Sequence, residues 1–171
     1  GRIINSGRGT LKRVSGYDLT RLMVGSEGTL GVFTEIILRL IPKPPAEATL
    51  VAFFDESDKA IQFSIGLLNK GILPRAMEYV DAMSLKSVQK YKSADSHANR
   101  GKPELQVPAD AQAMLLMEFD GEPNDVDRQA GESEKLLRES EPISVKRAVS
   151  KEASDYLWSI RKAISAALYS I

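Results

Sequence analysis

Residues 16–35 read GYDLTRLMVGSEGTLGVFTE, and this stretch decides how the start of the chain folds. Asp18 is placed to cap a short helix, because its carboxylate can accept hydrogen bonds from the free amides of the first turn. Gly25 suits the left-handed conformation that commonly follows the end of a helix. From residue 32 to residue 41 the pattern changes to a period of two, which predicts a long strand. The stretch therefore predicts a helix, a glycine turn and a strand.

The glycines of the turn, Gly25, Gly28 and Gly31, are spaced three apart. Glycine permits a positive φ and removes the Cβ that would keep a ligand away from the backbone. The turn is therefore either a backbone that lies close to a nucleotide or only a tight connection. The G-x-G-x-x-G dinucleotide motif follows a strand and opens a helix, whereas these glycines follow a helix and open a strand. A conventional Rossmann site is not predicted.

The same stretch resembles G-Y-D-L-T/K-x-L-x-V/I-G-S-E-G-T-L-G-V/I-I/F-T, a pattern at the end of the FAD-binding domain in flavoproteins of the vanillyl-alcohol-oxidase (PCMH) type. It is most similar to the branch with glycolate oxidase D subunits, D-lactate dehydrogenases and D-2-hydroxyglutarate dehydrogenases. The resemblance implies FAD as the cofactor, contacted mainly through the backbone. The cofactor-binding residues that it implies are Gly25, Ser26, Glu27, Gly28, Thr29, Leu30, Gly31, Val32 and Phe33.

A second informative stretch, residues 157–168, reads LWSIRKAISAAL. Helical spacing places Arg161 and Ser165 together, at the border of an apolar stripe. The guanidinium group can bind a carboxylate through two parallel hydrogen bonds, or the side chain can simply lie over the helix surface with its charge in water. The stretch resembles the family's L-W-x-I/L-R-x-x-I/S-S/T-x-A-L segment. The resemblance implies that Arg161 and Ser165 contact the substrate, a small 2-hydroxy acid.

Composition excludes several classes of function. Lys plus Arg equals Asp plus Glu, 23 each, so no nucleic acid or charged membrane surface is indicated as a partner. The chain has no cysteine, and its single histidine, His97, cannot build a metal site alone. No apolar run approaches the roughly 20 residues of a transmembrane helix. We expect a cytoplasmic protein that reaches a membrane only through partner subunits.

The rest of the chain predicts an α+β domain. Residues 41–48 contain three prolines and read as a linker. Strands are expected at 48–54, 75–80, 112–119 and 143–149, helices at 55–70, 82–91, 125–139 and from 151 onward, and a polar loop at 92–111. This order is typical of a ferredoxin-like antiparallel sheet with helices on one face. We assign residues 1–44 to the end of a PCMH-type FAD-binding domain and residues 45–171 to part of a substrate-binding cap domain.

Two acidic residues of the expected second strand have a structural role in this interpretation. Glu78 and Asp81 do not share a face of a strand, and Asp81 is placed to cap the following helix.

Several family motifs are missing: the P-G-G pyrophosphate loop, H-x-G-D-G-N and E-H-G. We therefore interpret the chain as a fragment with no catalytic residue and no metal ligand of its own, which alone binds FAD weakly or not at all. The resemblance implies that the complete enzyme transfers a hydride from a glycolate- or D-lactate-type acid to flavin N5 and passes electrons to a second acceptor, such as a partner subunit. Alternatives are an alcohol oxidase or alkyl-glycerone-phosphate synthase of the same group, or a non-catalytic ferredoxin-like binding module.

Overall fold

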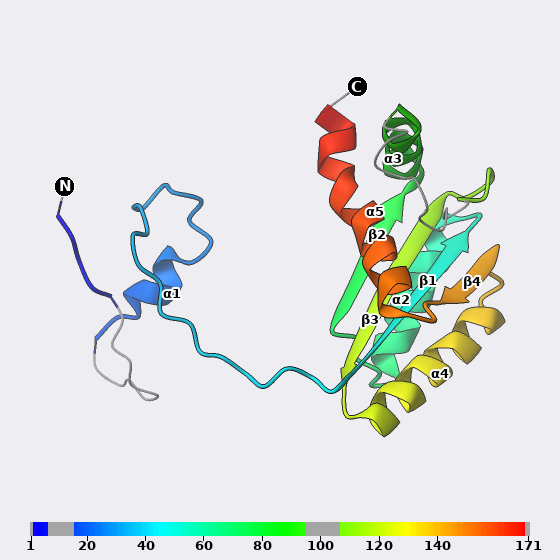
Figure 1. The fold of residues 1–171 in the computed structure, drawn as a ribbon, viewed down its shortest axis with the longest axis horizontal. Helices are drawn as coiled ribbons and strands as arrows, with labels where there is room; N and C mark the ends of the chain where they lie inside the picture. Colours follow the sequence, from blue (N-terminus) through cyan, green and yellow to red (C-terminus); the bar gives the residue numbers. More distant parts are fainter. Residues whose placement is uncertain (1, 7–15, 95–106, 170–171) are drawn as a thin grey trace. The chain divides into compact units, whose positions relative to one another are not determined.

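The computed structural model describes residues 2–6, 16–94 and 107–169, and the chain forms two compact units, Gly1–Pro42 and Lys43–Ile171. The first unit contains the short helix α1, Leu19–Met23 (Figure 1). The predicted cap is confirmed, because the backbone N–H of Arg21 donates to Asp18 Oδ1 at 3.1 Å. The predicted left-handed glycine is also confirmed, with Gly25 at φ 81° just after the helix.

The strand predicted over residues 32–41 is wrong. These residues have no regular secondary structure, and side chains of both expected faces are exposed, Val32 at 89% and Ile37 at 86%. A strand is stabilised by hydrogen bonds to a neighbouring strand. The described part of the first unit contains no strand with which residues 32–41 could pair. The sequence of residues 2–5, RIIN, also predicts a strand, but residues 2–6 are irregular. Residues 7–15 lie outside the described residues.

The second unit is built on a four-stranded antiparallel sheet with the order β2-β3-β1-β4 (Figure 1). The strands are β1, Ala46–Phe54; β2, Ala76–Asp81; β3, Ala113–Gly121; and β4, Ser144–Arg147. All four predicted strands are confirmed within a few residues at their ends. The two central strands, β1 and β3, consist largely of apolar residues that are buried on both faces of the sheet.

Helices α2, Ser57–Asn69, and α4, Pro123–Glu139, cover one face of the sheet, as predicted. The inner side of α2 differs from the one that helical spacing predicts, which consists of Ala60, Ile61, Ser64, Ile65 and Leu68. Ala60, Phe63 and Leu67 are buried, whereas Ile61 and Ile65 are nearly half exposed. Only one side of a helix can face the sheet, and this orientation buries the ring of Phe63 with its centroid 6.5 Å from that of Phe54.

Helices also lie on the other face, which the sequence analysis did not predict. There α3, Ala82–Ala94, and α5, Lys151–Tyr169, pack over the central strands (Figure 1). Strands that are apolar on both faces need cover on both, which explains the second helical layer. The predicted cap of α3 is confirmed, since the N–H of Ser84 donates to Asp81 Oδ1 at 2.7 Å. Residues 95–106 of the expected polar loop lie outside the described residues.

Candidate functional site

A row of polar contacts joins α5 to the sheet. Ser154, Trp158 and Arg161 are spaced four and three residues apart, so they lie on one side of the helix. Each contacts a different strand. Ser154 Oγ lies 2.6 Å from Thr49 Oγ1 on β1, Trp158 contacts β3, and Arg161 contacts β2. Helix α5 therefore crosses the sheet from β1 to the edge strand β2 and is fixed at three points.

The middle contact of this row is a buried carboxylate. Glu118, on β3, is 4% exposed and accepts hydrogen bonds from the indole N–H of Trp158 and from Nη2 of Arg75. Arg75 is half-exposed and also lies 3.6 Å from Asp120. A buried charge is stable only with such donors, because leaving it unpaired costs several kcal/mol. Glu118 therefore fixes the side of α5 that carries Trp158 and, three residues later, Arg161.

Arg161 is the last of the three contacts. Its Nε donates to Glu78 Oε2 at 2.9 Å, and the side chains of Arg161 and Glu78 are 40% and 34% exposed. Neither terminal nitrogen, Nη1 or Nη2, has a partner among the described residues. Ser165, one turn later, is exposed, and its hydroxyl makes no hydrogen bond with a described residue. The arrangement leaves the Nη1/Nη2 edge of the guanidinium available to an anion.

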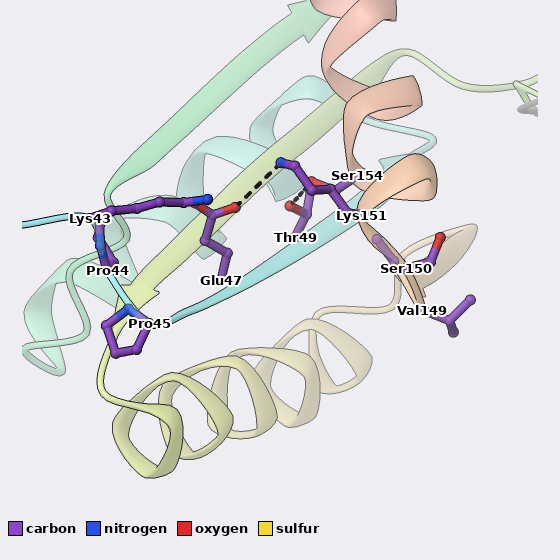
Figure 2. A pocket seen from close by; sticks show the side chains of 10 residues that line it. Lys43, Pro44, Pro45, Glu47, Thr49, Val149, Ser150, Lys151 and Ser154 are labelled. Carbon is purple, nitrogen blue, oxygen red and sulfur yellow. Dashed lines mark hydrogen bonds and ion pairs between the residues drawn. The ribbon is translucent and has the colours of Figure 1, made fainter.

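A pocket of about 330 Å³ lies at the start of α5. Figure 2 shows Lys151 and Ser154 on α5 facing Glu47 and Thr49 on β1, with Lys43 nearby. Lys151 Nζ is 4.0 Å from Glu47 Oε2 and 3.6 Å from Asp155 Oδ1. The pocket is therefore polar, and the ammonium group of Lys151 beside it is paired with two carboxylates. Neither Arg161 nor Ser165 lines it.

The first turn of α5 stabilises charge near this pocket. A backbone hydrogen bond, together with one from the Ser150 side chain, lowers the pKa of Glu152 below its ordinary value. A carboxylate in the first turn of a helix is also favoured by the helix dipole. Glu152 therefore loses its proton at a lower pH than an ordinary glutamate.

The predicted FAD-binding segment, residues 25–33, lies in the first unit, and three of its features bear on whether it could bind a ligand. The positions that a Cβ would occupy at Gly25, Gly28 and Gly31 have no atom of residues 2–6, 16–94 or 107–169 within 4 Å. The backbone N–H groups of Glu27, Gly28 and residues 30–33 donate to no other described residue. Ser26 Oγ is buried and has no hydrogen-bond partner in the described part of the chain. Open space, free donors and an unpaired buried hydroxyl fit a segment that binds a ligand through its backbone.

Arg75, Glu118 and Thr49 were not predicted as site residues from the sequence, and Glu78 was predicted without a partner. One signal was available: Glu118 is a carboxylate between the apolar residues 113–117 and Phe119, and such a group needs buried donors. Among residues 2–6, 16–94 and 107–169, no three His, Cys, Asp or Glu side chains are grouped so that they could hold a metal ion. The same ranges contain no helix that is long and apolar enough to cross a bilayer.

Residues 43–170 match the family of FAD linked oxidases, C-terminal domain, and the chain belongs to this family. Glycolate oxidase subunit GlcD of Bacillus subtilis (strain 168) is 35% identical over 168 residues, which cover 98% of this chain and 33% of that protein. GlcD of Escherichia coli (strain K12) is 33% identical over 147 residues, 86% of this chain and 27% of that protein. D-lactate dehydrogenase of Archaeoglobus fulgidus is 32% identical over 161 residues, 94% of this chain and 33% of that protein.

The chain spans about a third of the length of these relatives. A solved structure of alkyldihydroxyacetonephosphate synthase is similar with a TM-score of 0.57 at 18% identity, over 90% of this chain and 29% of that one. At that identity the likeness concerns the fold alone. The family membership confirms the resemblance from which FAD and the oxidoreductase class were predicted.

Proposed function

We propose that the complete protein is an FAD-linked oxidoreductase that oxidises a small 2-hydroxy acid of the glycolate or D-lactate type. One observation carries the proposal: Arg161 presents an unpaired Nη1/Nη2 edge beside the sheet while its Nε is held by Glu78. Such an edge matches the two oxygens of a carboxylate. Relatives named glycolate oxidase subunit and D-lactate dehydrogenase support this substrate class.

Residues 25–33 are the segment that would hold FAD, because they combine free N–H groups with glycines that leave the backbone accessible. When bound, FAD would supply the acceptor for the hydride that leaves the α-carbon of the acid. The assignment of residues 1–44 to an FAD-binding domain and of residues 45–171 to a cap domain is part of the same proposal. The final electron acceptor would be a separate subunit, consistent with relatives that are named as subunits.

The role of Arg161 is to bind and orient the substrate. Its guanidinium would take the carboxylate end-on, and Ser165 would add a hydroxyl donor one turn later. A charge-assisted hydrogen bond of this kind is worth about 1.5–3 kcal/mol. The contacts of Trp158 and Ser154 with the sheet keep the helix in place, so that the arginine is presented in one position.

Two alternatives predict other ligands. An alcohol oxidase or an alkyl-glycerone-phosphate synthase of the same group has no need of a carboxylate clamp at Arg161, and a non-catalytic binding module would hold no flavin. The available Nη1/Nη2 edge favours an anionic substrate over an alcohol, and the relatives named glycolate oxidase subunit and D-lactate dehydrogenase favour a carboxylate over a phosphate.

The test is substitution of Arg161 in the complete protein. R161M should lower kcat/KM for the hydroxy acid by about 10- to 150-fold while the bound flavin stays at the wild-type level. R161K should recover only part, because lysine cannot reproduce the bidentate fork. R138M is the matched control, since Arg138 forms an ion pair with Glu134 on α4, on the opposite face of the sheet. An R161M variant with lower thermal stability but unchanged kcat/KM would make Arg161 a structural residue only.

A further inference from the structure

We infer that Glu78 is a positioning residue that fixes the guanidinium of Arg161 and determines which edge of it binds a carboxylate. The inference rests on the proposed function, since it assumes that Arg161 binds the substrate. Glu78 accepts from Nε, the nitrogen nearest the side-chain stem, and leaves Nη1 and Nη2 without a described partner. A ligand carboxylate is therefore taken end-on by these two nitrogens and does not replace Glu78.

Both members of the pair lie on elements that are themselves held in place. Glu78 lies in the middle of β2, opposite Leu116 of β3, and Arg161 lies three residues after Trp158, which donates to the buried Glu118. The hydrogen bond between Arg161 and Glu78 thus connects α5 with β2 through two residues that lie 83 positions apart in the chain. A free arginine side chain samples many rotamers. A hydrogen bond from its guanidinium to a residue on a rigid strand removes most of that freedom before the ligand binds.

Glu78 also has an opposing effect, because a second carboxylate near the guanidinium repels the ligand. Each side chain of the pair is exposed by a third or more, so water and salt screen this repulsion. The hydrogen bond from Arg161 Nε to Glu78 is a direct contact, so salt weakens it less than it weakens the repulsion between Glu78 and the ligand. Loss of Glu78 should therefore weaken carboxylate binding, although it makes the surroundings of Arg161 more positive.

The experiment measures the dissociation constant of oxamate, a carboxylate that cannot be oxidised, from the change in flavin absorbance of the complete protein. E78A should raise this constant by about 3- to 20-fold, the lower part of the range that coupling between contacting residues spans, because both side chains are partly exposed. E78Q should raise it less, because the amide oxygen still accepts from Nε. E134Q is the control, since it removes the carboxylate partner of Arg138 at similar exposure on α4. Flavin content and melting temperature show whether each variant is folded.

A second comparison places E78A in the R161M background. If Glu78 acts only through Arg161, the double variant binds oxamate no more weakly than R161M alone. An unchanged or lower constant in E78A and E78Q overturns the inference, and a lower one would mean that Glu78 competes with the ligand. If R161M itself binds oxamate normally, the proposed carboxylate clamp fails as well, so the two failures are distinguishable. E78Q keeps the test decisive if E78A does not fold.

Discussion

Replacing Glu118 is the sharpest test of how α5 is attached to the sheet. The carboxylate is 4% exposed and accepts from two donors, the Trp158 indole and Arg75. The indole hydrogen bond to a buried charge contributes about 1.5–3 kcal/mol. Arg75 is 47% exposed, so its ion pair with Glu118 is treated as a surface ion pair. Such a pair contributes about 0.5–1 kcal/mol to the free energy of unfolding. E118A should therefore lower the free energy of unfolding by about 2–4 kcal/mol.

The assay is urea unfolding of the 171-residue chain, followed by circular dichroism and by fluorescence. Trp158 is the only tryptophan, so its emission reports directly on this contact. E118Q should be destabilised by about 1–2 kcal/mol, because the amide retains an acceptor for the indole but loses the charge. E132A on the exposed side of α4 is the control and should change stability by less than about 0.5 kcal/mol. A loss below about 0.5 kcal/mol in E118A, with Trp158 emission unchanged, would refute the reasoning.

Two further predictions concern a helix cap and the FAD segment. The Ser84 backbone N–H lowers the pKa of Asp81, so the stability that this carboxylate adds is complete above about pH 3.9, the ordinary aspartate value, and is lost as pH falls through the lower folded value. D81A should therefore cost about 1 kcal/mol at pH 7 and nothing in strong acid, as acid-to-neutral urea titrations would show; an equal loss at both pH values would contradict this. G28A in the complete protein should reduce retained FAD, whereas G71A, with a similar φ of 75° against 82° and equally open space, should not; equal flavin content in the two would exclude a ligand contact at Gly28.

The sheet and its helices were predictable from the sequence because their patterns are local. Period-two and helical spacings between breakers located every strand and helix of the second unit, and Asp81 was recognisable as a cap. Which side of α2 faces the sheet was not predictable, since isoleucines and a phenylalanine compete for one buried face. The prediction of a strand over residues 32–41 is wrong for a related reason. A period of two in the sequence does not show whether a partner strand is present.

The candidate site was only half predictable. Arg161 and Ser165 were found from helical spacing and from the family resemblance, and their roles remain predictions. The partners of α5 come from strands 40 to 105 residues away in the chain, so no local pattern connects Glu78 with Arg161 or Thr49 with Ser154. Only Glu118, an acidic residue within the apolar run of residues 113–119, indicated that a buried polar contact had to exist.

Anaerobic reduction of the flavin tests the central proposal most directly. The complete protein, purified with its flavin, would be mixed without oxygen with glycolate or D-lactate, and in parallel with ethylene glycol or 1,2-propanediol, which lack the carboxylate. The account predicts that the acids bleach the flavin absorbance, that the diols do not, and that R161M requires about 10- to 150-fold more acid for half-bleaching. A colourless protein, or bleaching by the diols as readily as by the acids, would contradict it.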